Sequence, residues 1–257
     1  MIAAALALGL LVGAVLGLVG AGGSIIAVPA LVYGVGMSTH DAIPTSLLVV
    51  GLSSIAAVIP RIRTGISWRI ALPVGAAGIP AAWGGAAAGR LLNEEVLLLA
   101  FAAIMVAAGA RMLPKTPEIT GHCGSDQGSF LRSCLPKAAA VGLGIGFLTG
   151  LLGVGGGFLI VPALTLFLGL SMSQAVGTSL VIITINAAAG FSAHATGFTI
   201  DWVPTLAFAI PAIAGSLAAS RLSHKLNSKH VRTAFAILVF AVAAIVAVST
   251  IIGIIGG

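Results

Sequence analysis

The sequence has very few charged residues. Only 7% of its 257 residues are Asp, Glu, Lys or Arg, whereas a soluble domain carries about 25%. So few charges cannot keep the surface of a protein of this size in water, which excludes a soluble globular enzyme. Hydrophobic residues make up 59% of the chain, and no polar low-complexity tract or Gly-X-Y repeat is present, so disordered and fibrous chains are excluded too. The composition is that of an integral membrane protein.

Motifs for catalysis and for metal binding are also missing. There is no HExxH motif, no Ser-His-Asp order and no phosphate-binding lysine loop. Cys123 and Cys134 lie with His122 in the longest loop, and their spacing matches no standard zinc pattern. The sequence therefore predicts no metal site and no cofactor, and supports neither an enzyme nor an ATP-driven pump. Because this loop is expected in the reducing cytoplasm, free thiols are favoured over a structural disulfide.

Long apolar runs dominate what is present. Crossing the lipid core takes about 20 residues of helix. Two further runs are shorter and each follows a glycine cluster, which suits half-helices or re-entrant segments around a wet cavity. The expected fold is all-α: a polytopic transmembrane helix bundle. The full-length runs are Ile2–Val19, Ala42–Pro60, Ile70–Gly89, Val96–Met112, Ala138–Leu152, Ala175–Ala193, Val203–Ser220 and Val231–Ile255, and the short ones are Ile25–Val35 and Phe158–Leu170.

The basic residues predict how the bundle is oriented. All but Arg90 of the 12 Lys and Arg residues fall in three loops, Arg61–Arg69, Arg111–Lys137 and Arg221–Arg232. By the positive-inside tendency these loops face the cytoplasm, while the segment His194–Trp202, which has no Lys or Arg, faces outward. The net charge of +6 therefore reports orientation rather than a nucleic-acid partner. We expect a multi-pass protein of the plasma membrane, that is, the bacterial inner membrane.

The chain contains an internal repeat. An offset of 133 residues aligns Gly17–Leu47 with Gly150–Leu180, and 15 of these 31 positions are identical. A second stretch, Ile79–Leu91, matches Ile210–Leu222 with a small shift. Aligned Pro and Thr-Ser-Leu residues are not easily imitated by a composition rich in Ala and Gly. The sequence therefore predicts two copies of one helical module.

The loops of the two copies differ in charge. Arg61–Arg69 is basic, whereas its counterpart His194–Trp202 is not. The halves are therefore predicted to lie upside down relative to each other, as the inverted-topology repeats of secondary transporters do, with substrate near mid-membrane. The predicted domains are an N-terminal transmembrane repeat at residues 1–113, a cytoplasmic linker at 114–136 and a C-terminal transmembrane repeat at 137–257.

The duplicated glycine clusters are the first candidate substrate site. A helix that begins just after such a cluster presents unpaired N–H groups and a partial positive charge, which together suit an anion. Starts at Ser24 and Gly157 would supply two such groups. The alternative is that the small residues only let helices pack closely. The candidate substrate-binding residues are Gly22, Gly23, Ser24, Gly155, Gly156 and Gly157.

Polar side chains inside the apolar runs are the second candidates. The pairs Thr45-Ser46 and Thr178-Ser179 stand at the predicted starts of full-length helices, where their hydroxyls would cap the helix, bond a neighbouring helix or bind an oxyanion. Asn186 lies well inside its run, and its repeat counterpart, Ser53, is also polar. A buried amide in lipid needs a partner, so Asn186 is predicted to line a cavity.

Charged groups at the helix ends are the third set of candidate residues. Arg61 and His194 occupy equivalent positions in the two copies. They are interpreted either as interfacial anchors that snorkel or as residues that attract an anion to the two mouths of a pathway. None of the six Asp and Glu residues falls at the middle of a span. Cation pumps and proton-coupled carriers usually keep a carboxylate there, so the pattern favours an anionic cargo.

The duplicated element GxGG[GS]xxxxPAL, at Gly20–Leu31 and Gly153–Leu164, is followed each time by Thr-Ser-Leu. In this it resembles the sulfite exporter TauE/SafE family of membrane permeases. Ser24 departs from the all-glycine stretch of the second copy. The resemblance implies export of sulfite, sulfoacetate or another sulfur-containing organic anion, without fixing which one.

Together these features predict a secondary transporter that exports a small anion by alternating access. Its expected partners are that substrate and the lipid bilayer, with no nucleic acid; the coupling ion, proton or sodium, and the oligomeric state are left open. The alternatives are a cation-coupled carrier of a different substrate, a non-transporting membrane assembly factor, and an intramembrane enzyme, for which no nucleophile and base stand out.

Overall fold

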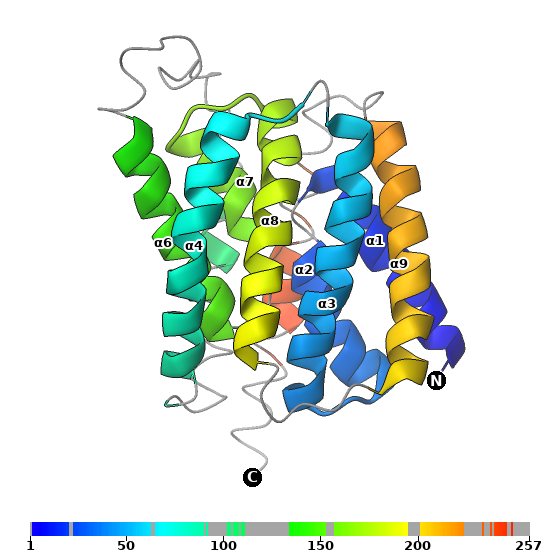
Figure 1. Ribbon diagram of the computed structural model, residues 1–257. Helices are drawn as coiled ribbons and strands as arrows, with labels where there is room; N and C mark the ends of the chain where they lie inside the picture. Colours follow the sequence, from blue (N-terminus) through cyan, green and yellow to red (C-terminus); the bar gives the residue numbers. More distant parts are fainter. Residues whose placement is uncertain are drawn as a thin grey trace.

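The computed structural model is an all-helical bundle throughout the residues that it describes, as the sequence predicts (Figure 1). These are residues 2–20, 23–62, 65–89, 91, 102–103, 105–107, 109–110, 134–152, 157–194 and 201–223, with 233, 237, 239–245 and 248. The predicted linker at 114–136 falls almost wholly outside this set. So do most of the predicted runs Val96–Met112 and Val231–Ile255.

The observed helices follow the predicted runs closely. α1 has the bounds predicted for it, and the other long helices begin one to three residues earlier than predicted. Both short runs are helices that follow the glycine clusters. The elements are α1 (Ile2–Val19), α2 (Gly23–Pro29), the π-helical segment η1 (Ala30–Val35), α3 (Thr39–Val58), the 3-10 turn η2 (Ile59–Arg61), α4 (Trp68–Gly89), α6 (Leu135–Leu152), α7 (Gly157–Leu166), α8 (Met172–His194) and α9 (Trp202–Ser223).

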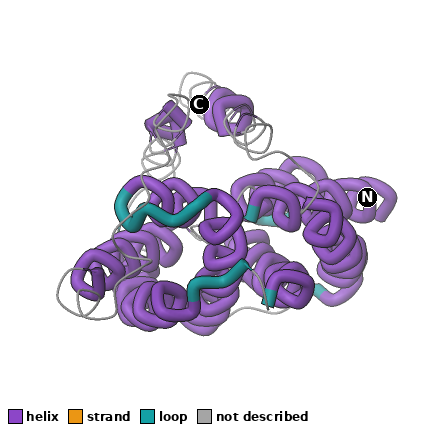
Figure 2. Tube along the Cα trace, turned by 90° about the horizontal axis from the view of Figure 1, so that it is seen from above, coloured by secondary structure: helices purple, strands orange, loops and turns teal. Residues whose placement is uncertain are grey.

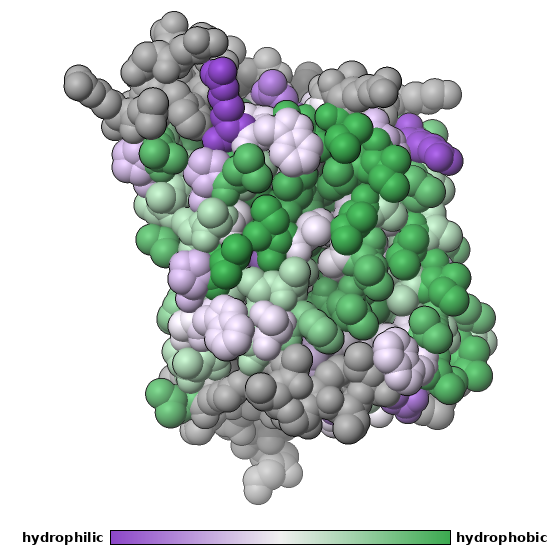
Figure 3. Space-filling view, viewed as in Figure 1, coloured by the Kyte–Doolittle hydropathy of each residue, from purple (hydrophilic) through white to green (hydrophobic). Residues whose placement is uncertain are grey.

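The outer surface of the bundle suits lipid. Within the described part of the chain, five helical segments are long and apolar enough to cross a membrane: Ile2–Val19, Asp41–Arg61, Trp68–Gly89, Met172–Ala193 and Trp202–Leu222. Large apolar side chains such as Leu10, Leu72 and Ile210 are exposed on them. In Figure 3 apolar side chains cover the middle of the visible face, and hydrophilic ones lie near its upper and lower edges. The protein is therefore a multi-pass membrane protein.

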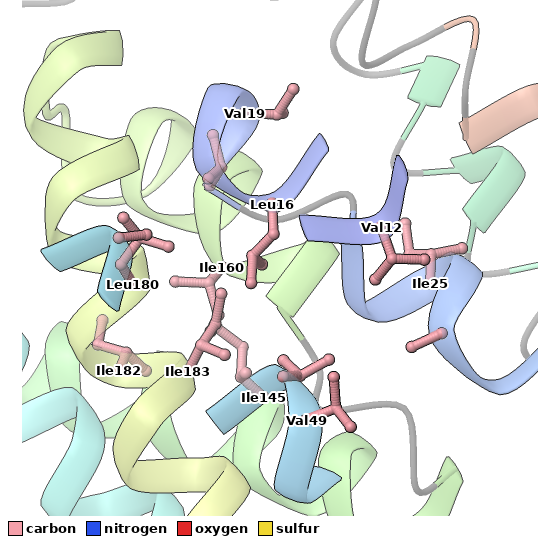
Figure 4. Close-up of a cluster of buried hydrophobic side chains, with 14 of the residues drawn as sticks. Val12, Leu16, Val19, Ile25, Val49, Ile145, Ile160, Leu180, Ile182 and Ile183 are labelled. Atoms are coloured by element: carbon pink, nitrogen blue, oxygen red, sulfur yellow. The ribbon is translucent and has the colours of Figure 1, made fainter. Parts of the chain in front are cut away.

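Each half of the chain packs its outer helices on the other half. α1 packs along α9, and α4 packs along α6, while α3 and α8 contact each other between these pairs (Figures 1 and 2). The short helices α2 and α7 also meet. Buried side chains from both halves, including Leu16, Ile25, Ile160 and Leu180, form one apolar core (Figure 4). α1 of one half thus takes α9 of the other as its partner, and α6 takes α4.

Two glycine stripes make the outer pairs close. Gly9, Gly13 and Gly17 of α1 lie against the main chain of α9, and a Cβ at any of them would overlap a backbone carbonyl there. Gly142, Gly146 and Gly150 of α6 lie in the same way against α4. Small residues at four-residue spacing let helix backbones approach in lipid. These glycines therefore serve close helix packing, and the two stripes match at the repeat offset.

The order of contacts gives the helix directions. Gly9, Gly13 and Gly17 face Phe208, Ala212 and Ser216 in that order, so α1 and α9 run the same way, and the α6 stripe shows the same for α4. Leu47 lies at Gly190 and Gly51 at Ala187, so α3 and α8 run in opposite directions. How the two halves are oriented in the membrane stays a prediction.

The close contact at a glycine stripe can be tested by adding a single methyl group, that is, by a Gly→Ala substitution. Gly146→Ala places a Cβ against the backbone of Gly78, whereas the exposed Gly144 in the same helix has open space around it. Overpacking a close contact costs about 1–3 kcal/mol. We expect Gly146→Ala to lower the thermal unfolding temperature in detergent and Gly144→Ala to leave it unchanged or slightly raised. Equal unfolding temperatures for the two variants would contradict the close contact.

Candidate functional site

The first glycine break lies against the opposite half of the protein. Gly20 ends α1 with a left-handed backbone (φ 74°), and its N–H donates to the carbonyl of Leu16 (2.8 Å). A Cβ on Gly20 would meet Val176 and Ser179 of α8. Ser179 Oγ lies 2.8 Å from the Gly20 carbonyl and 2.8 Å from that of Val176, and both accept its proton. The structure thus joins one predicted glycine cluster to one predicted Thr-Ser pair.

The other glycine candidates fall at or beside the breaks. α2 begins at Gly23, one residue before the predicted start, and α7 begins at Gly157 as predicted. Gly23 is buried against Val12 and Leu16 of α1. Three candidate residues, Gly22, Gly155 and Gly156, and the side chain of Ser24 lie outside the described residues.

The Thr-Ser pairs lie inside their helices and not at the starts. α3 and α8 begin six residues before Thr45 and Thr178, and the caps are other residues. Ser38 Oγ accepts from the N–H of Asp41 (3.2 Å), and Ser171 Oγ accepts from the N–H of Gln174 (3.4 Å). The capping interpretation of the pairs is therefore wrong, because the helices extend one turn further than the apolar runs do.

Within the pairs the four hydroxyls differ in their partners. All four side chains are buried. Thr178 Oγ1 accepts from the N–H of Ser67 (3.0 Å) and so anchors the start of α4, while Ser46 Oγ donates to the carbonyl of Ile43 (2.8 Å). Thr45 Oγ1 has no hydrogen-bond partner. A hydroxyl left unpaired inside a protein is costly, so Thr45 is the member of the pairs that most needs a ligand or water.

Asn186 is a buried amide without a partner. Its side chain is 0% exposed, and neither Oδ1 nor Nδ2 has a hydrogen bond. It lies against Gly78 of α4, which leaves room because it has no side chain. Ser53 and Ser54 of α3 are also buried, and their hydroxyls have no partner. Each such group costs about 1–3 kcal/mol of stability unless something satisfies it.

These unpaired groups lie near the middle of the bundle. Gly51 of α3 packs on Ala187 of α8, and Ser53, Ser54 and Asn186 are within a few residues of that contact. Ser54 and Thr205, a further buried threonine without a partner, were not predicted from the sequence. The polar doublet Ser53-Ser54 within an apolar run was a usable signal for Ser54, but no pattern marks Thr205.

Arg61 is buried and does not snorkel. Only 4% of it is exposed; its Nε donates to Ser220 Oγ (3.1 Å) and its Nη2 donates to the carbonyl of Gly17 (3.2 Å). Ser220 Oγ in turn donates to the carbonyl of Ala57 (2.7 Å). The Gly17 carbonyl belongs to the last turn of α1, where carbonyls lack helical partners and a cation is favoured. The interfacial-anchor interpretation is therefore wrong, because Arg61 binds the ends of three helices together.

His194 is the last residue of α8, as its repeat position predicts, and its side chain lies outside the described residues. In the described part of the chain the carboxylates are Asp41 and Asp201, and each stands at the start of a helix. The described helix interiors therefore carry no acidic group, in agreement with the sequence.

The expectation of free thiols is wrong for Cys134. It directly precedes α6, is buried and is disulfide-bonded, whereas the sequence favoured free thiols. Cys123, the other cysteine of the chain, lies outside the described residues. A reducing compartment limits how well a disulfide survives but does not decide whether the chain geometry permits one.

Known proteins resemble this chain over most of its length. The family model described as "Sulfite exporter TauE/SafE" matches residues 5–246. A "Probable membrane transporter protein" of Xylella fastidiosa (strain 9a5c) is 35% identical over 237 residues, which cover 91% of this chain and 90% of the relative. The "Probable membrane transporter protein YunE" of Bacillus subtilis (strain 168) is 29% identical, covering 86% and 88%. No solved structure matches the chain. The chain therefore belongs to the sulfite exporter TauE/SafE family of membrane transporters.

Proposed function

We propose that the protein is a secondary transporter that exports a small anion, a sulfur oxyanion such as sulfite or an organosulfonate such as sulfoacetate. The observation that carries this proposal is Asn186, whose amide is fully buried at mid-bundle with both polar atoms unpaired. Its N–H groups and the hydroxyls of Ser53 and Ser54 are hydrogen-bond donors, and a sulfite or sulfonate group presents several acceptor oxygens. Buried polar groups are satisfied in working proteins, so a ligand or water is expected there.

An anion fits these donors better than a cation does. The described helices offer no carboxylate away from their ends, and a carboxylate would repel an anion in a low-dielectric interior. The family to which the chain belongs carries a sulfite exporter description, which supports the same chemistry. A cation site at this level would have to be built from carbonyls and hydroxyls alone.

The remaining candidate residues have proposed roles around this centre. The main-chain N–H groups at Gly22, Gly23 and Ser24, and at Gly155, Gly156 and Gly157, would receive oxygens of the anion at the starts of α2 and α7. Thr45, Ser46, Thr178 and Ser179 would supply hydroxyls from α3 and α8. Ser179 already bonds the carbonyl of Gly20, so it ties the glycine break to the opposite half.

Alternating access is the proposed mechanism. The two halves exchange partners in a matched way, because α1 pairs with α9 as α6 pairs with α4, and α3 runs antiparallel to α8. An inverted repeat with this pairing can open to either side when its halves exchange conformations around a central site. The inverted membrane topology itself is part of the proposal.

Transport is the direct test. Purified protein in liposomes should accelerate counterflow of labelled sulfite or sulfoacetate well above the rate of protein-free vesicles. Chloride and acetate serve as comparison anions. Rates equal to those of empty vesicles for every anion in the panel would rule out the proposed activity.

The substitution Asn186→Leu distinguishes a role of the amide in substrate binding from a role in folding. Leucine has a similar branched shape and removes two unpaired polar atoms, so stability should be unchanged or raised by about 1–3 kcal/mol. Counterflow should fall at least tenfold, because the central donors are lost. Ser192→Ala on the same helix is the control, since Ser192 is exposed and its hydroxyl bonds its own helix at Ala189. Full transport by a folded Asn186→Leu variant would show that the amide has no part in binding.

The inverted topology is tested by labelling. Single cysteines at Arg63 and Thr199, in a chain whose native cysteines are replaced by serine, should react with a membrane-impermeant thiol reagent from opposite sides of the membrane. Arg63 is expected to react only from the cytoplasmic side. Reaction of both positions from the same side is incompatible with an inverted repeat.

A further inference from the structure

Gly78 of α4 is buried against the side chain of Asn186. Among the described residues, the three atoms nearest to a Cβ built on Gly78 all belong to the Asn186 carboxamide. They are Oδ1, which the Cβ would overlap, Cγ at 3.0 Å and Nδ2 at 3.2 Å. A side chain on Gly78 would therefore have to take space that the amide occupies.

α4 has no room to move away from α8. On its other side its main chain meets α6, because a Cβ on Gly146 would overlap the Gly78 carbonyl oxygen and lie 2.5 Å from the Gly78 Cα. That contact is between two helix backbones, which yield little. The amide, in contrast, is the end of a side chain that can turn about its own torsion angles. A methyl group on Gly78 would therefore displace the amide and leave the helices in place.

The other half of the protein shows that the close helix contact does not itself require glycine at this position. Gly13 of α1 faces Ala212 of α9 as Gly146 of α6 faces Gly78 of α4, and Gly13 and Gly146 match at the repeat offset. Ala212 thus makes the same close backbone contact although it carries a side chain. The missing side chain at Gly78 therefore has another reason.

The two halves combine side chains of different size at this level. In the second half the long carboxamide of Asn186 lies against Gly78. In the first half Ser53 stands in place of Asn186, and Ala212 stands in place of Gly78. Ser53 lies beside α9, since its carbonyl accepts from Ser216 Oγ (2.8 Å), one turn beyond Ala212. The short side chain thus accompanies alanine, and the long one accompanies glycine.

We propose that Gly78 is a positioning residue of the anion site, because its missing side chain leaves the place in which the Asn186 amide binds the anion. The amide would have to move by about 1 Å to reach ordinary contact with a methyl group. A hydrogen bond forms only over a range of about 0.5 Å in donor–acceptor distance, so such a shift would lose it. This inference rests on the proposed function, since it takes the amide as a ligand of the anion.

Gly78→Ala is tested by counterflow of labelled sulfite into liposomes. Hydrogen bonds to a charged group contribute about tenfold or more to affinity, so the half-saturating sulfite concentration should rise by about that factor. A role confined to folding would lower the maximal rate and leave the half-saturating concentration unchanged. Gly84→Ala is the matched control on α4, because Gly84 is exposed and no described heavy atom lies within 4 Å of its Cβ position. An unchanged half-saturating concentration in Gly78→Ala would overturn the inference.

The same substitution is then made in the Asn186→Ser background. The double variant reproduces the combination of Ser53 and Ala212 with which the first half folds. If Gly78 acts through the amide, adding Gly78→Ala to Asn186→Ser should change the half-saturating concentration less than about twofold, because coupled residues are not additive. A loss of the same factor in both backgrounds would show that Gly78 acts on something else.

Thermal unfolding in detergent without substrate supplies a second readout. Gly78→Ala should lower the unfolding temperature by a few degrees when Asn186 is present, because the amide is forced from its place. In the Asn186→Ser background it should leave the unfolding temperature unchanged or raise it. An equal decrease in both backgrounds would overturn the contact, and this comparison decides the matter if Asn186→Ser transports too slowly to measure.

The two proposals fail separately. If the native protein shows no anion counterflow, the anion function fails, and the unfolding temperatures still show whether Gly78 positions the amide. If the native protein transports sulfite and Gly78→Ala leaves the half-saturating concentration unchanged, the positioning role fails and the anion function stands.

Discussion

The close contact of glycine-striped helices holds the whole bundle together. Lipid gives helices no hydrophobic reason to associate, so they depend on backbone approach and on van der Waals packing. α1 reaches the main chain of α9 through Gly9, Gly13 and Gly17, and α6 reaches that of α4 through an equivalent stripe. Each contact joins one half of the chain to the other. The central helices α3 and α8, which carry most of the buried polar groups, are positioned by these outer pairs.

The buried polar side chains fall into two sets, those with a hydrogen-bond partner and those without one. Thr178, Ser216, Ser220 and Arg61 make hydrogen bonds between helices and so belong to the architecture. The side-chain polar atoms of another set have no hydrogen-bond partner in the described structure: Asn186, Ser53, Ser54, Thr45 and Thr205. The unpaired set lies on α3, α8 and α9. In a helix bundle this division separates residues that hold the fold from those that are candidates for a ligand or water.

Much of the fold could be predicted from the sequence, because the apolar runs and the repeat are long-range patterns that survive local variation. The bounds of α1 and the start of α7 at Gly157 are examples. The site was harder, because partners are set by packing. Arg61 was expected to reach water, and only the approach of Gly17 and Ser220 from other helices shows it buried. Thr205 looks ordinary in the sequence, and only the packing of α9 in the bundle shows that its hydroxyl is buried without a partner.

Arg61 also makes the two ends of the bundle mechanically unequal. Its guanidinium fastens α1 to α9 at the end of α3 where the chain turns toward α4, and hydrogen bonds to a charged group are worth about 1.5–3 kcal/mol each. The copy-related position holds an imidazole, which has fewer donors and a charge that varies with acidity. Separating α1 from α9 at this end would therefore require these hydrogen bonds to break. Under the proposed alternating access, the cost of opening would therefore fall mainly on the side of the bilayer where Arg61 lies.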